Sequence, residues 1–111
     1  MYKILFLLSF LLLIFFCSDK ITQVHVNNQN DEMVNILIKS NTGSTKIINI
    51  DSIPGRSITP YIEISPTNGG IISASRIGIK PKDINFHAVM GNSYIITLSS
   101  GDNPILTWEK E

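Results

Sequence analysis

Beyond residue 20 the chain alternates between isoleucine-rich runs and short polar breaks. In one run, Val34, Ile36 and Ile38 occupy every second position, and side chains at this spacing lie on one face of a β-strand. A later run has the same period between Tyr94 and Leu98. The pattern predicts strands over residues 21–26, 33–39, 46–50, 58–64, 71–79, 86–90, 93–99 and 105–109.

The polar breaks predict how these strands are joined. Residues 40–44 and 65–70 are rich in Gly, Asn, Ser and Thr, and both predict hairpin loops. Residues 91–92, a Gly-Asn pair, predict a two-residue hairpin between the strands on either side. The breaks therefore favour strands that pair with their neighbours in sequence.

Two prolines refine this picture. Pro54 precedes Gly55, a pair that predicts a tight turn with a positive φ available at the glycine. Pro60 cannot donate a ladder hydrogen bond, so its strand is expected at a sheet edge or at a bulge. After residue 17 no apolar recurrence at three and four residues predicts a helix.

These elements predict an all-β fold. Seven to eight short strands in about ninety residues are typical of a small antiparallel β-sandwich, immunoglobulin-like or transthyretin-like in shape. A small β-barrel is the second architecture that fits the same pattern. We assign the domain to residues 20–111.

The first nineteen residues follow a different pattern. Lys3 precedes an apolar block over residues 4–16 that only Ser9 interrupts, and the block stops at Cys17, the single cysteine. A positive start, a short apolar stretch and a polar exit are typical of an export signal. A membrane-spanning helix needs ~20 apolar residues, so this block is short for that purpose.

The junction Ile14-Phe15-Phe16-Cys17 resembles that of bacterial lipoprotein precursors. Ile14 matches the aliphatic residue that the family has three positions before the cysteine, whereas Phe16 stands where the family has a small residue. The resemblance implies a signal peptide over residues 1–16, a lipid-anchor junction over residues 17–19, and fatty acyl groups such as palmitate on Cys17. An ordinary secretory signal and an uncleaved membrane anchor are the two alternatives, and all three place the domain outside the cytoplasm.

The residue directly after Cys17 indicates which membrane is expected to hold the protein. In the enterobacterial pathway, Asp directly after the lipidated cysteine favours the inner membrane, and here Ser18 holds that position. The resemblance therefore favours the outer membrane.

Because Lys3 lies in the leader, eight basic and nine acidic side chains remain from residue 18 onward, a net charge of −1. Without a basic stripe we expect no nucleic-acid partner, and without a second cysteine no internal disulfide.

No residue pattern predicts catalysis. His25 and His87 lie in expected strands with no second ligand nearby, so we interpret both as outward-facing strand residues. Asp31 and Glu32 form an adjacent acidic pair, which is most often solvated in a loop. No serine lies in a G-x-S-x-G motif. We expect no catalytic residues, no metal site and no cofactor.

Candidate contact residues lie in loops and at the C-terminus. Residues 51–57 and 65–70 flank the same expected strand, so they should lie at opposite ends of the sandwich, and the first loop carries Arg56. Leu106 and Trp108 share one face of the last strand. Trp108 fits the core better than a contact site, although both roles suit a tryptophan.

These observations favour two functional hypotheses over a third, a hydrolase or metal-dependent enzyme, for which the sequence offers no convergent set of polar residues. The first is a non-enzymatic, lipid-anchored protein of the bacterial cell envelope that binds another envelope protein as an accessory module. The alternative is a periplasmic immunity or inhibitor lipoprotein that neutralises a toxin or a wall-degrading enzyme. In either case we expect the membrane, through the lipid on Cys17, and one further envelope protein as partners.

Overall fold

The computed structural model describes residues 21–40 and 45–111, and those residues contain nine strands. The expected signal peptide, the anchor junction at Cys17 and most of the first hairpin loop lie outside the described residues. The strands are β1 (Gln23–Asn28), β2 (Val34–Ser40), β3 (Lys46–Ile53), β4 (Ser57–Ile58), β5 (Ile62–Glu63), β6 (Thr67–Arg76), β7 (Ile84–Ala88), β8 (Ser93–Leu98) and β9 (Leu106–Lys110).

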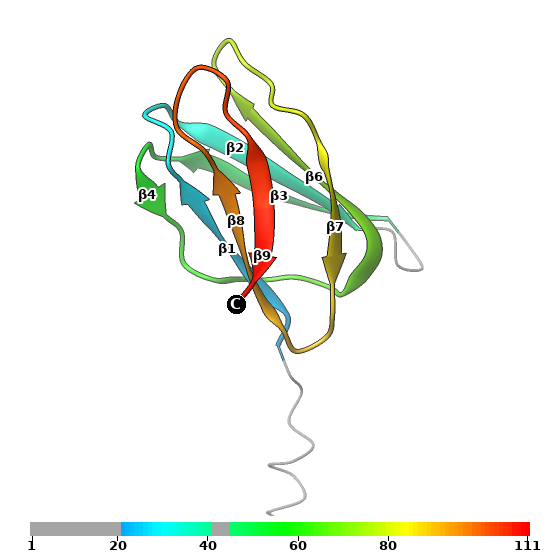
Figure 1. Cartoon of the computed structure of the whole chain (residues 1–111). Coiled ribbons are helices and arrows are strands. Elements are labelled where there is room, and N and C mark those ends of the chain that lie inside the picture. Colours follow the sequence, from blue (N-terminus) through cyan, green and yellow to red (C-terminus); the bar gives the residue numbers. More distant parts are fainter. Residues whose placement is uncertain (1–20, 41–44) are drawn as a thin grey trace, which may run out of the picture.

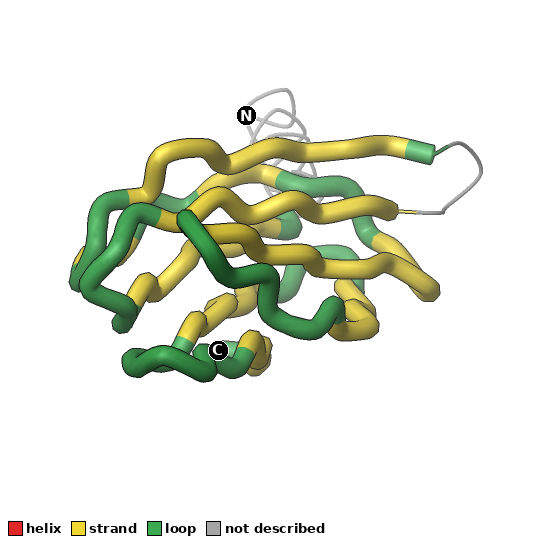
Figure 2. The backbone as a smooth tube through the Cα atoms, turned by 90° about the horizontal axis from the view of Figure 1, so that it is seen from above, coloured by secondary structure: helices red, strands yellow, loops and turns green. Residues whose placement is uncertain are grey.

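The strands form two sheets that pack face to face as a β-sandwich (Figures 1 and 2). One sheet has the order β4-β1-β8-β9, with β5 also paired to β1, and the other has the order β3-β2-β6-β7. All pairs are antiparallel except β1 and β8, which run parallel over six residue pairs. The described residues contain no helix. The all-β sandwich expected from the sequence is therefore confirmed, with one parallel pair added.

Among residues 21–40 and 45–111 we find no helical segment with the length and hydropathy of a transmembrane span.

The core follows the period of two that the sequence shows. Val24 and Val26 of β1 are fully buried, and Ile36 and Ile38 of β2 meet them from the opposite layer of the sandwich. The other large contributions come from Ile53, Ile72, Phe86, Tyr94, Ile96 and Leu98. Burial of these side chains is the main stabilising term for a domain whose described residues include no cysteine.

The hairpin expected at residues 91–92 is wrong. β7 belongs to one sheet and β8 to the other, so residues 89–92 cross between the layers. Gly91 has a φ of 82°, and the Asn92 N–H donates to the Val89 carbonyl over 3.2 Å, which closes the turn. Strands on facing sheets both point apolar residues into the core, so their alternation looks the same as that of a hairpin.

The loop expected over residues 65–70 is also wrong from residue 67 onward. β6 begins at Thr67 and pairs with β7 through a bulge between Thr67 and Gly70. A Cβ on Gly70 would lie 3.0 Å from the Lys39 carbonyl oxygen. Glycine is therefore needed here because the two strands approach each other closely, and not because the chain reverses its direction.

Pro60 lies at a sheet edge, as expected. The edge strand beside β1 is divided into β4 and β5, and the proline lies between them. Thr59 spans the gap, since its hydroxyl accepts a hydrogen bond from the Val26 N–H at 2.9 Å and its own N–H donates to the Val26 carbonyl at 2.9 Å. The edge thus keeps β1 paired where the proline interrupts the ladder.

Candidate functional site

Four loops gather at the end of the sandwich away from the start of β1 (Figure 1). They join β1 to β2, β3 to β4, β6 to β7, and β8 to β9. We refer to them as the distal loop cluster, which comprises residues 29–33, 54–56, 77–83 and 99–105. Loops on a rigid sandwich are where binding residues usually concentrate, so the contacts that order this cluster decide what it can bind.

Asn28, at the end of β1, anchors two of these loops. Its side chain is fully buried, and its amide nitrogen donates to the carbonyls of Glu32 at 3.0 Å, Pro54 at 3.0 Å and Ile53 at 3.2 Å. Its amide oxygen accepts the Asn30 N–H at 3.0 Å. The polar atoms of this buried side chain are therefore paired, as burial requires.

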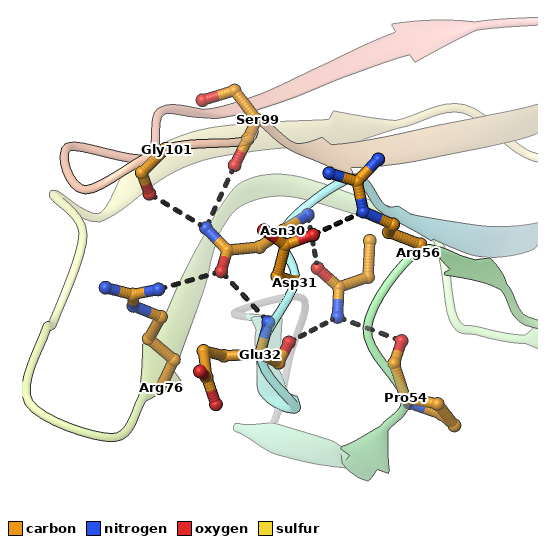
Figure 3. A network of polar contacts seen from close by, with 9 residues as sticks. Asn30, Asp31, Glu32, Pro54, Arg56, Arg76, Ser99 and Gly101 are labelled. Carbon is orange, nitrogen blue, oxygen red and sulfur yellow. Dashed lines mark hydrogen bonds and ion pairs between the residues drawn. The ribbon is translucent and has the colours of Figure 1, made fainter.

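Asn30 joins the two sheets and is 1% exposed. Its amide nitrogen donates to the carbonyls of Ser99 at 3.3 Å and Gly101 at 3.1 Å, and its amide oxygen accepts from Arg76 Nη1 at 2.8 Å and from the Glu32 N–H at 3.2 Å (Figure 3). Its backbone carbonyl accepts the Arg56 N–H at 2.9 Å. One residue thus contacts three loops and the end of β6.

The turn at Pro54 and Gly55 differs from the sequence prediction. The positive φ falls on Arg56, at 53°, and not on Gly55. Gly55 is required for another reason, because a Cβ there would overlap the backbone carbonyl oxygen of Asp31. The left-handed conformation of a non-glycine residue is unfavourable, and the Asn30 carbonyl and the Asp31 carboxylate both bind Arg56.

Arg56, a predicted contact residue, forms an ion pair with Asp31 at the surface of the cluster. The side chains are 72% and 71% exposed, and the Arg56 Nε donates to the Asp31 carboxylate. This hydrogen bond, together with the charge of Asp31, raises the pKa of Arg56 above its ordinary value. An exposed pair contributes little stability, so its main effect is to present two fixed charges.

A hollow of about 300 Å³ lies beside this pair, between the first and last loops of the cluster. Its lining combines the carboxylates of Asp31, Glu32 and Asp102 with the guanidinium of Arg76 and the side chain of Ile77. Ile77 is 86% exposed, so most of this apolar side chain is open to solvent at the hollow. The hollow therefore offers charges of both signs next to exposed apolar surface.

Trp108, the other predicted contact residue, lies apart from Arg56 in the seam between β9 and β7. It is half-buried and packs edge-on against Phe86 and Tyr94, with ring centroids 5.2 Å and 5.6 Å away. Its indole N–H donates to the Asn85 carbonyl at 2.7 Å. The structure does not bring the two predicted residues together, and the packing of Trp108 matches the core role.

The histidines do not converge with other chemical groups of the described chain to form a metal site. Within residues 21–40 and 45–111, no group of three His, Cys, Asp or Glu side chains could hold a metal ion. His25 stacks on Tyr61 at 4.2 Å and lies 2.9 Å from the Glu111 carboxylate. Tyr61 donates to the same carboxylate, and this hydrogen bond raises its pKa. His87 is exposed on β7.

The fold and the ordered loops define a small β-sandwich domain with a rigid polar end. No protein-family model and no curated protein sequence matches the chain. Among solved structures, the fold is similar to the C-terminal domain of AlgF from P. aeruginosa, with 18% identity and a TM-score of 0.58, over 83% of this chain and 99% of that one.

Two further structures share the fold. A protein from Eubacterium rectale matches with 16% identity and a TM-score of 0.56, over 79% of this chain and 87% of its own. A protein from Bacteroides ovatus, for which a role in cell adhesion has been suggested, matches with 10% identity and a TM-score of 0.52 over 83% of this chain and 44% of its own. At these identities the similarity shows the fold alone.

Proposed function

We propose that the chain is a non-enzymatic, lipid-anchored protein of the bacterial cell envelope whose distal loop cluster binds another envelope protein as an accessory module. The observation that carries this proposal is the buried pair Asn28 and Asn30, whose hydrogen bonds connect three of the four distal loops to one another and to the end of β6. The suggested adhesion role of the Bacteroides ovatus protein supports a binding function for this fold.

Loops that are ordered before a partner arrives favour tighter binding. A binding surface made of mobile loops loses conformational entropy when its partner arrives, and this loss reduces affinity. In this domain the loops are already connected through Asn30 to both sheets. The exposed ion pair of Asp31 and Arg56 supplies charge for orientation, and Ile77 supplies apolar area.

The proposal also includes the cellular location of the protein. Cys17 carries the lipid, the outer membrane is the favoured location, and residues 20–111 face the periplasm or the cell surface. Metabolic labelling with palmitate tests this anchor: label is expected in the wild-type chain and absent from Cys17→Ala. An unlabelled wild-type chain that remains in the cytosol would contradict it.

Site-specific crosslinking in intact cells tests the binding surface. A photo-crosslinking amino acid in place of Ile77 is expected to give one dominant product with a second envelope protein, and the same group in place of Asn49, exposed on β3, is the matched control. Arg56→Glu is expected to reduce the product formed from position 77. Equal products from both positions would show that the distal loop cluster is not a specific contact surface.

The identity of the captured protein separates the two functional hypotheses. A structural or transport component of the envelope supports the accessory role. A toxin or a wall-degrading enzyme that loses activity when bound would replace that role with the inhibitor role.

A further inference from the structure

Three apolar side chains are exposed at the end of the sandwich opposite the distal loop cluster. Ile21 is 55% exposed, Val89 47% and Met90 69%. We refer to them as the proximal apolar patch. The start of β1 and the connection between β7 and β8 lie at this same end (Figure 1).

The patch belongs to an ordered part of the structure. The Gly91 N–H donates to the Thr22 hydroxyl at 2.9 Å, and the Gln23 N–H donates to the Asn92 carbonyl at 3.3 Å, so Ile21 lies beside the turn that carries Met90. The Val89 N–H donates to the Tyr94 hydroxyl at 2.8 Å. These contacts fix the backbone that carries the three exposed apolar side chains, so the side chains lie together at one end of the sandwich.

The length of chain between the patch and Cys17 identifies what covers it. Four residue steps separate Cys17 from Ile21, and at most ~3.6 Å per step gives a reach of about 14 Å. If the thiol carries acyl chains in a bilayer, this end of the sandwich cannot move far from the headgroups. We propose, on the basis of the lipid anchor in the proposed function, that the proximal apolar patch inserts into the interface of the phospholipid bilayer that holds Cys17.

Charged side chains of both signs lie at this end of the sandwich. Lys110 is exposed and lies opposite Tyr94 in the ladder of β8 and β9, where its ammonium is available to lipid phosphates. Glu63 is also exposed and lies opposite Gln23 of β1. The carboxylate of Glu111 lies on the outer face of its sheet, beside His25 and Tyr61. The proposed contact therefore depends on the apolar side chains and not on an excess of positive charge.

A patch of three side chains is sufficient because the tether makes the contact intramolecular. A short linker gives an effective concentration in the millimolar range, so a weak surface is occupied most of the time. Contact at this end also fixes the orientation of the sandwich, and it directs the distal loop cluster away from the membrane that holds the anchor.

Fluorescence quenching by lipids tests the contact. The lipidated full-length chain is extracted from membranes and reconstituted into vesicles of phosphatidylethanolamine and phosphatidylglycerol that contain nitroxide-labelled lipid. Because its lipid blocks Cys17, a cysteine introduced by Met90→Cys takes the fluorophore, and Ile77→Cys is the distal control. Quenching is expected to be several-fold greater at position 90, and Val89→Asp in the Met90→Cys chain should lower it to the control level.

Three other outcomes would contradict the proposed membrane contact, and they can be distinguished from one another. Equal quenching at positions 90 and 77, with palmitate still in the vesicles, rules out the contact and leaves the anchor intact. Disulfide-linked dimers of the unlabelled Met90→Cys chain, together with little quenching in the labelled chain, show that a second copy covers the patch. Absence of palmitate from the vesicle-bound chain removes the anchor and the contact together.

Discussion

Asn28 and Asn30 are buried polar side chains at the end of a strand whose other inward residues are valines. The sequence predicts only a polar link between two strands at residues 27–32. The side chain of Asn30 is paired with Arg76, Ser99 and Gly101, which are about fifty to seventy positions away in the chain, and that of Asn28 is paired with Ile53 and Pro54 about 25 positions away. Local composition therefore identifies the break but not the network, because the partners come from the tertiary fold.

Asn30→Ala tests the importance of this network. The change leaves Arg76 Nη1 and two loop carbonyls without their partner, so we expect the free energy of unfolding to fall by about 3 kcal/mol. Urea denaturation followed by circular dichroism measures the difference. Asn103→Ala, at an exposed position of the same cluster, should stay within about 0.5 kcal/mol of wild type. Similar small losses in both variants would mean that the network does not stabilise the domain.

Gly55→Ala tests the close approach of two distal loops. A Cβ at this position overlaps the Asp31 carbonyl oxygen, and backbone atoms cannot yield cheaply, so a loss of about 2–3 kcal/mol is expected. Gly69→Ala is the matched control, because a Cβ at this position meets nothing within 4 Å. Since Gly69 lies in a strand, we expect the free energy of unfolding of this variant to rise by up to about 1 kcal/mol. Thermal unfolding of both variants gives the comparison, and a stable Gly55→Ala chain would contradict the geometry.

At the scale of elements, the period of two predicts most strands and the inward face of each. Val34, Ile36 and Ile38 are buried as the pattern indicates, and so are Tyr94 and Leu98. The joining of strands is less predictable, because periodicity reports which face is apolar and not which neighbour completes the ladder. For this reason the chain crossing at residues 91–92 reads as a hairpin, and the Gly-rich start of β6 reads as a loop.

Trp108 closes the seam between the two sheets, and two substitutions separate its contributions. Trp108→Phe removes the hydrogen bond to the Asn85 carbonyl but keeps an aromatic ring against Phe86, so a loss of about 1 kcal/mol is expected. Trp108→Ala also removes the packing, and a loss of about 3–4 kcal/mol is expected. Urea unfolding followed by far-ultraviolet circular dichroism measures both. If neither variant loses stability, Trp108 is a surface contact residue rather than part of the core.

At the scale of the whole molecule, β1 holds one sheet together. It lies between the divided edge of β4 and β5 and the parallel strand β8, so it pairs with three other strands. The sequence predicts that residues 21–26 form a strand but not that this strand is central. Its position depends on a partner about seventy residues away, and no local pattern reports such a pairing.

Removal of β1 tests this central position. A chain that begins at Gln29 loses the ladder to β8 and both edge strands, so we expect no cooperative unfolding transition and no near-ultraviolet circular dichroism from Trp108. A chain that begins at Ser18 retains every described strand, so it should unfold in one transition. Cooperative unfolding of the shorter chain would show that β8 and β9 assemble without β1.

The parallel pairing of β1 with β8 also sets the order in which the protein can be completed during its synthesis. Gln23 pairs with Ser93, and the register ends at the pair of Asn28 and Leu98. β1 is therefore synthesised early, but it can pair with β8 only after about seventy more residues have been added. Contacts between such distant parts of a chain form slowly. The sheet that contains β1 and β8 is therefore incomplete until synthesis is almost finished.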